Sequence, residues 1–172
     1  MRQLLYRLGQ FKRARQDAPS PEGLVRAREA LSPQLFDLFS QMLPFEQAHA
    51  GRVYDGLISR GQDDPDLLAA GLLHDVGKAR RPLRPWERAA AVTVKALLPG
   101  AFAKWGQGKP HGLAAGIVVA AQHAGWGAQM AAEAGAGERL VRLIRCHDAE
   151  LAQVPEPDRQ AVAVLQAVDA VN

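Results

Sequence analysis

The chain has 172 residues, of which 48% are hydrophobic and 23% charged, and its formal net charge is +3. This length fits one domain with a core of its own, and the composition argues against a disordered chain. A single cysteine excludes an internal disulfide framework and is typical of a reducing cytoplasm, where we expect the protein to function. We expect no signal peptide and no membrane span, because no stretch approaches the roughly 20 apolar residues that a span needs.

Almost every segment has the hydrophobic spacing of a helix, and none alternates convincingly with the period of a strand. We therefore predict an all-α fold. The expected helices cover residues 2–15, 21–31, 33–43, 45–59, 65–77, 86–98, 112–121, 124–134 and 137–147, with a last one from about 157. Residues 101–111 contain Gly106, Gly108 and Pro110, which predict a mobile connection.

Basic residues dominate the segment from Lys78 to Lys109. They are Lys78, Arg80, Arg81, Arg84, Arg88, Lys95, Lys104 and Lys109, and the one acid among them is Glu87. Such a run can steer a polyanion towards a binding site, or it can simply form a solvated face. The sequence leaves both interpretations open.

Histidines and aspartates fall on the apolar faces of five of the expected helices. His74, for example, extends the stripe Leu67, Ala70, Gly71, and His147 extends a stripe with the same spacing. One inward histidine is more often an ordinary core residue than a ligand. Five helices that each direct imidazole or carboxylate inward favour a shared site, because a buried carboxylate is costly unless it is paired or binds a metal. Imidazoles and carboxylates without cysteine suit iron, manganese or zinc.

Three segments resemble the HD-domain metal-dependent phosphohydrolases. The first is LLHDVGK (Leu72 to Lys78), with His49 in FEQAHAGRVY 25 positions before its histidine. The second is HAGWGAQMAAEAGAGERLVRLIRCH, from His123 to His147, which is similar to the stretch H-x-x-x-G-A … I-R-x-H of HD proteins with two metals. The third is VLQAVDAVN at the end of the chain, which is similar to the helix that carries the last ligand in that family. The resemblance covers about residues 45–172.

The resemblance implies an HD-domain helical bundle over residues 45–172, preceded by an N-terminal helical extension over residues 1–44 that begins with a basic stretch. It also implies two metal ions, iron or manganese before zinc. The implied metal ligands are His49, His74, Asp75, His123, His147 and Asp169. In this arrangement Asp75 bridges the metals, His49, His74 and Asp169 hold one of them, and His123 and His147 hold the other.

The catalytic residues that we expect are Asp75 and Lys78. Lys78 follows the expected helix end and could reach over the metals, although a lysine there also stabilises a helix C-terminus without any catalytic role. Arg80, Arg81 and Arg84 are expected to bind the more distal phosphates of a substrate, because guanidinium pairs bidentately with phosphate.

The resemblance implies hydrolysis of a small phosphorylated substrate, a nucleotide or a related phosphate ester or anhydride. The ligand set is most similar to that of the bacterial HD hydrolases that cut diadenosine tetraphosphate symmetrically. The alternatives are a nucleotidase or another small-metabolite phosphatase, and a non-catalytic metal-binding HD module with a signalling or docking role. Nucleic acid is not expected as a partner, because the basic segments lack interleaved aromatic residues. The sequence leaves the oligomeric state open.

Two histidine or aspartate positions resemble ligands without fitting the pattern. Asp148 forms a second His-Asp pair with His147, but only the histidine matches, so we expect Asp148 at the surface or behind the ligands. His111 lacks the G-A continuation and is expected at a pocket rim or in solvent. The Gly-Tyr-Pro signature of the HD-GYP signalling enzymes is absent, which disfavours a cyclic-dinucleotide phosphodiesterase.

Overall fold

In the computed structural model, residues 18–172 are described, and they form nine α-helices, three short 3₁₀ helices and no strand, which confirms the all-α prediction. The expected basic helix at residues 2–15 lies outside the described residues. The α-helices are α2 (Pro21–Ala30), α3 (Pro33–Ser40), α4 (Pro44–Ser59), α5 (Pro65–Leu73), α6 (Pro85–Leu97), α7 (Pro99–Trp105), α8 (Ala115–Glu133), α9 (Glu138–Cys146) and α10 (Glu156–Asp169). The 3₁₀ helices are η1 (Val76–Arg80), η2 (Gly112–Ala114) and η3 (Leu151–Gln153).

Most of these helices begin at a proline, as the sequence predicts. Proline suits the first helical turn because its fixed φ matches the helix and its missing N–H is not needed there. The preceding residue often caps the helix. The Ser20 hydroxyl accepts from the Gly23 N–H at 3.0 Å, and the Asp64 carboxylate accepts from Asp66 and Leu67.

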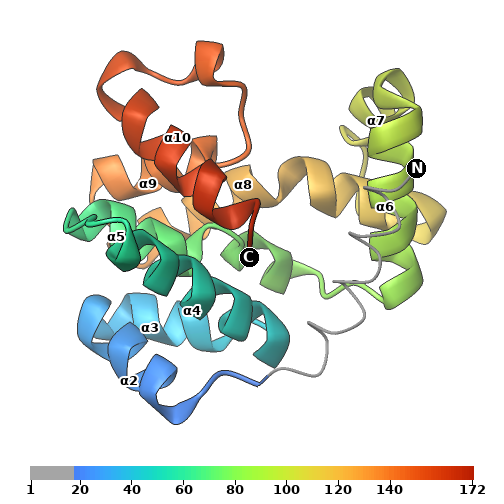
Figure 1. The fold of residues 1–172 in the computed structure, drawn as a ribbon. Helices are drawn as coiled ribbons and strands as arrows, with labels where there is room; N and C mark the ends of the chain where they lie inside the picture. The colour runs from blue at the N-terminus through green and yellow to red at the C-terminus, as the bar shows by residue number, and fades with distance from the viewer. Residues whose placement is uncertain (1–17) are drawn as a thin grey trace.

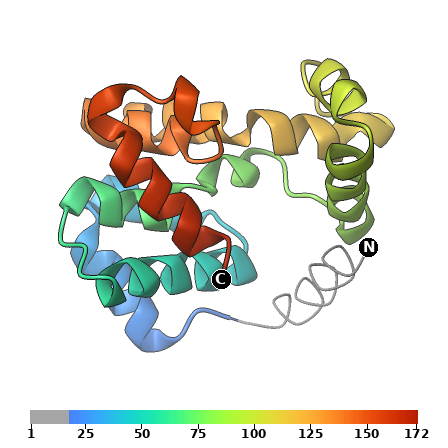
Figure 2. The same ribbon diagram turned by 45° about the horizontal axis from the view of Figure 1, so that its top comes forward.

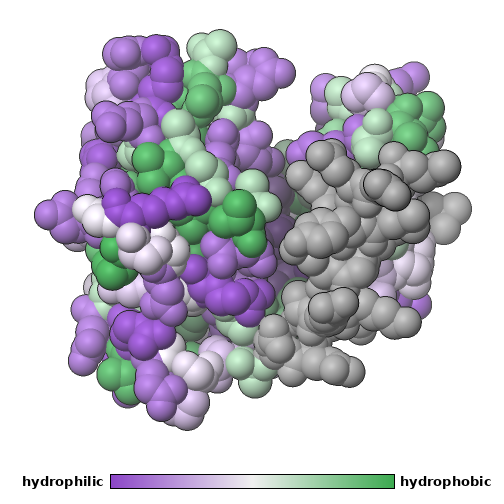
Figure 3. Space-filling view, in the orientation of Figure 1, coloured by the Kyte–Doolittle hydropathy of each residue, from purple (hydrophilic) through white to green (hydrophobic). Residues whose placement is uncertain are grey.

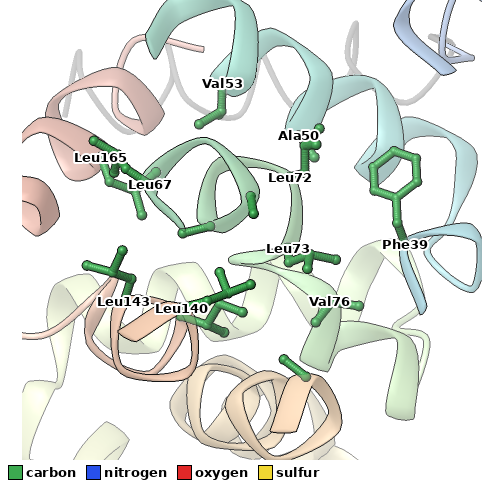
Figure 4. Close-up of a cluster of buried hydrophobic side chains, with 14 of the residues drawn as sticks. Phe39, Ala50, Val53, Leu67, Leu72, Leu73, Val76, Leu140, Leu143 and Leu165 are labelled. Carbon is green, nitrogen blue, oxygen red and sulfur yellow. The ribbon is translucent and has the colours of Figure 1, made fainter. Parts of the chain in front are cut away.

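Helix α5 lies at the centre of the main body, between α4 on one side and α9 and α10 on the other (Figures 1 and 2). Its leucines Leu67, Leu72 and Leu73 point in different directions into one core, in which they meet residues of the surrounding helices (Figure 4). The long helix α8 runs from this body to the pair α6 and α7, which stands at the other side of the molecule (Figure 2).

Helices α2 and α3 pack into the same core. Their buried residues Ala27, Leu35, Leu38 and Phe39 belong to one continuous hydrophobic cluster with α4, α5 and α9. The part of the expected N-terminal extension that the structure describes is therefore a further layer on the bundle.

The structure differs from the sequence predictions in three places. Helix α5 ends at Leu73 and not at Gly77, and the chain tightens into η1, so that the His74-Asp75 pair lies at a junction between two helices. Residues 99–105 are helical, because Pro99 starts a helix that the expected connection did not include. The chain from 115 to 133 is one helix without the expected interruption, since it contains no proline and is rich in alanine.

The segment that follows α7 is hydrogen-bonded to α8. The side-chain amide of Gln122 on α8 donates to the carbonyl oxygens of Gly106 at 2.6 Å and Gly108 at 3.1 Å. Gly106 is also buried against α8. Both glycines are therefore bonded to α8, and the mobility expected of this segment stays a prediction. Among residues 18–172, no helix has the length and apolar character needed to cross a membrane.

Candidate metal centre

The six expected ligands lie together in the structure as two adjacent groups of three. One group consists of His49, His74 and Asp169, and the other of Asp75, His123 and His147. Within each group the potential ligand atoms all lie within 4.8 Å of one another. The residues come from α4, α8, the end of α10 and the residues that follow α5 and α9, so five segments far apart in the sequence converge on one place.

In the first group, the Asp169 carboxylate lies between the two histidines. Its Oδ1 is 2.9 Å from Nε2 of His49 and 3.6 Å from Nε2 of His74. His74 is fully buried, whereas His49 and Asp169 are partly exposed. This group therefore forms the solvent-exposed side of the centre.

The second group is buried. Nε2 of His123 lies 3.2 Å from Nε2 of His147, and these two atoms lie 3.3 and 3.8 Å from Oδ1 of Asp75. Each of the three side chains is almost inaccessible to solvent. Any ligand of this group has to be small, because little open space surrounds it.

The hydrogen bonds of three of the histidines determine which ring nitrogen faces the centre. Nδ1 of His74, His123 and His147 lies 2.8–3.0 Å from the carbonyl oxygen of the residue three positions earlier. A carbonyl oxygen only accepts, so Nδ1 carries the hydrogen, and Nε2 of the neutral ring presents a lone pair. Metal-binding histidines are typically oriented in this way.

Two observations indicate that these lone pairs could bind a cation. Nε2 of His74 is buried and has no hydrogen-bond partner, which is costly for a polar atom. The Nε2 atoms of His123 and His147 face each other, and two lone pairs at this distance repel unless a proton or a metal ion lies between them. Burial, followed by the nearby His74 and His123, lowers the pKa of His147 to about 4. A proton on His147 is therefore disfavoured at neutral pH, and the residues fit a metal ion.

Asp75 connects the two groups. Its Oδ1 faces His123 and His147, while its Oδ2 lies 3.6 Å from Nε2 of His74 and 2.5 Å from Nζ of Lys78. Burial alone would raise the pKa of Asp75, but Lys78, His74 and His123 outweigh it and hold that pKa well below its usual range. Asp75 is therefore a carboxylate at neutral pH, with one oxygen for each group.

Helix ends add to the negative potential at the centre. His74 follows the last residue of α5, His147 follows the last residue of α9, and Asp169 is the last residue of α10. A helix C-terminus carries a partial negative charge that favours cations. Three such ends therefore meet where two carboxylates and four imidazoles already lie.

The two remaining pKa shifts in the centre follow from the same contacts. Burial would lower the pKa of His74, but the carboxylates of Asp75 and Asp169 raise it above its ordinary value. Burial would raise the pKa of Asp169, but its hydrogen bond with His49 and the nearby imidazole of His74 hold that pKa well below the usual range. Both shifts arise because the imidazoles and carboxylates of the centre attract one another. A bound cation would attract the carboxylates in place of a protonated imidazole.

The expected phosphate-binding arginines have different environments. Arg81 forms a double ion pair with the buried Glu87, at 2.9 and 3.2 Å. Arg80 and Arg84 are exposed, and the Arg80 guanidinium lies 5.5 Å from the ring centre of Trp126 on α8. Arg80 and Arg84 thus face solvent, whereas Arg81 is held by Glu87.

The sequence analysis did not single out Gly77, which lets η1 approach α8. A Cβ atom on Gly77 would collide with the backbone oxygen of His123 and would lie 2.6 Å from the backbone nitrogen of Gly127. The chain that carries Asp75 and Lys78 can therefore lie directly against the helix that carries His123 only if residue 77 has no side chain. In the sequence, this close approach is signalled by the glycine inside the HDVGK motif.

The burial of two glutamates was also missed. Glu46 and Glu87 each accept the backbone N–H three residues before them, at the starts of α4 and α6, and each also pairs with an arginine. The pair between Glu46 and Arg88 joins these two helices at 2.7 Å. The sequence signal is the repeated pattern Pro-aromatic-Glu, in which the glutamate is at the N3 position. His111 and Asp148 are exposed, as expected.

Comparison of the chain with protein-family models, with curated proteins and with solved structures finds no match.

We expect about two transition-metal ions per chain, iron or manganese before zinc, because the two groups each offer three ligands and share a carboxylate. Elemental analysis of protein purified anaerobically without chelator measures this. Removing the metal should also lower Tm, since an ion that binds only the folded state stabilises it by mass action. One ion per chain would contradict the two-metal centre, and a value near zero after reconstitution would contradict any metal site here.

Proposed function

We propose that this protein is a metal-dependent phosphohydrolase that acts on a nucleotide or a related phosphate ester or anhydride. The observation that carries the proposal is the position of Asp75, whose two oxygens face two separate groups of nitrogen and oxygen ligands, with the ammonium of Lys78 beside it. Paired sites that share a carboxylate suit phosphoryl transfer, in which both the attacking and the leaving oxygen need stabilisation.

Metal ions in such a pair supply Lewis acidity towards phosphoryl oxygens and make a water molecule acidic enough to attack at neutral pH. The chain supplies the rest. Asp75 and Asp169 keep the centre anionic, and the His49 and Asp169 side leaves an approach for the substrate. Lys78, whose side chain is 27% exposed, can release Asp75 and neutralise charge that develops on the phosphoryl group.

A substrate with several phosphates fits the surroundings better than a monophosphate. A monophosphate needs little charge beyond the centre, whereas a longer chain leaves anionic oxygens outside it. Arg80 and Arg84 follow Lys78 closely in the sequence and are exposed. We therefore infer a preference for dinucleoside polyphosphates or nucleoside triphosphates.

For these longer substrates we expect kcat/KM to exceed that for nucleoside monophosphates by roughly tenfold or more. The measurement is a panel of nucleotides and sugar phosphates, with products resolved chromatographically. Arg80→Ala should mainly raise KM for the longer substrates. Arg81→Ala is the less suitable variant, because it leaves the buried Glu87 carboxylate without its partner. Preference for monophosphates, unchanged by Arg80→Ala, would mean that the basic segment is only a solvated face.

Replacing Lys78 by alanine should lower kcat by roughly 10²–10³-fold with little change in KM, because the ammonium acts on charge that appears in the transition state. The matched control is Lys104→Ala, which removes an exposed lysine from α7. If the metal-loaded protein hydrolyses nothing on the panel, the non-catalytic metal-binding module becomes the better interpretation.

A further inference from the structure

Helices α6 and α7 form a hairpin to one side of the main body, joined to it through α8 and through the Arg88–Glu46 ion pair between α6 and α4 (Figures 1 and 2). None of the residues of α7 is buried, although its sequence PGAFAKW is largely apolar. A short helix of this composition normally needs an apolar partner for its exposed side. The hairpin therefore has a face without a partner among the described residues.

Large apolar side chains are exposed where the two helices join, at Leu97 and Leu98, and at the far end of α7, at Trp105. Leu97 is 65% exposed, Leu98 55% and Trp105 47%. Figure 3 shows hydrophobic residues gathered at this end of the molecule, over α7. Trp86 is a further exposed residue, at the other end of α6. Scattered exposed leucines need no explanation, but neighbouring ones with a tryptophan indicate an interaction site.

The charge around these apolar residues has one sign. Between Glu87 and Glu133 the sequence contains no aspartate or glutamate. Lys95, Lys104 and Lys109 are all exposed, and Nζ of Lys95 lies 5.6 Å from the ring centre of Phe102 on α7. We define the α6–α7 surface as Lys95, Leu97, Leu98, Lys104, Trp105 and Lys109. It combines exposed apolar side chains with exposed lysines.

We propose that the α6–α7 surface docks on an anionic lipid bilayer. Leucine and tryptophan side chains enter the boundary between headgroups and acyl chains, and lysines around them are attracted to acidic lipids while their stems lie along the apolar boundary. This is peripheral binding, which needs no spanning helix. It is independent of the chemistry of the metal centre.

Charge disfavours two other binding partners for the α6–α7 surface: a second copy of the chain, and the first seventeen residues of the same chain. A second copy of the chain would bring the same lysines against themselves if it docked through this surface in a symmetric dimer. The first seventeen residues of the chain contain Arg2, Arg7, Lys12, Arg13 and Arg15 but only one acid, Asp17. The charge of that sequence does not complement the basic α6–α7 surface, whereas it does complement acidic lipids.

The test is flotation of the full-length protein with vesicles of phosphatidylcholine alone and with 30% phosphatidylserine. We expect binding only to the phosphatidylserine vesicles, weakened by salt. Lys104→Glu/Lys109→Glu should weaken it at least tenfold, since each lysine contributes about a fivefold factor near such a surface. Arg28→Glu/Arg60→Glu changes the net charge equally at exposed positions on α2 and at the end of α4, and should have a smaller effect.

A second pair of variants tests the apolar residues of the α6–α7 surface. Leu97→Ser/Trp105→Ser should also weaken binding at least tenfold, whereas Ile58→Ser, at an exposed position on α4, should not. Circular dichroism and metal content check that each variant is folded. Equal flotation with both kinds of vesicle, or with neither, would overturn the proposal. So would wild-type binding by the lysine variant, which would assign lipid binding to other basic residues. A dimer that Leu97→Ser/Trp105→Ser dissociates would instead identify a second copy as the partner.

Discussion

Asp75→Asn should abolish nearly all phosphohydrolase turnover, by roughly a thousandfold or more, with loss of at least one metal ion per chain. The substitution keeps the shape of the side chain but removes the charge that both groups share. Asparagine also offers only one good acceptor atom, whereas the Asp75 carboxylate faces His123 and His147 with one oxygen and His74 and Lys78 with the other. Elemental analysis and product release measure the two losses, and circular dichroism should remain helical.

Asp148→Asn is the matched control. Asp148 also follows a histidine of the centre, but its side chain is exposed and it belongs to neither group. We expect wild-type metal content and activity from this variant. Full activity in Asp75→Asn, or equal losses in both variants, would show that the ligand assignment is wrong.

Gly77→Ala should destabilise the protein by about 3 kcal/mol or more and should reduce metal content and activity together. The new methyl group would overlap the backbone of His123 and Gly127, and backbone atoms cannot rotate away as a side chain can. Separation of η1 from α8 would move Asp75 and Lys78 away from His123. The measurements are thermal or denaturant unfolding and elemental analysis.

Gly125→Ala is the matched control, a glycine-to-alanine change on α8, the helix against which η1 lies. A Cβ at Gly125 would meet nothing within 4 Å, and alanine favours a helix over glycine. This variant should be more stable by roughly 0.5–1 kcal/mol and should keep its metal. If Gly77→Ala is as stable as Gly125→Ala, the close approach of η1 to α8 does not position the centre.

Local signals in the sequence were sufficient for most of the fold. Proline at the first turn and serine or aspartate before it locate the starts of α2, α3 and α5, because these preferences depend on the chain's own backbone groups. Local signals predicted the C-terminal ends of helices less well, as the end of α5 at Leu73 shows. The change from α5 to η1 depends on contact with α8, which no local pattern contains.

The sequence also determined which histidines and aspartates point inward, because helical periodicity places each of them on an apolar face. Only the tertiary structure decided how they group and what surrounds them. Asp75 acts between two groups because α5 ends one residue before His74 and η1 lies against α8. Arg81 is occupied because Glu87 is buried beside it, whereas Arg80 remains exposed. Periodicity is a property of one helix, but distances between side chains of different helices depend on packing, so they appear only when the whole core is assembled.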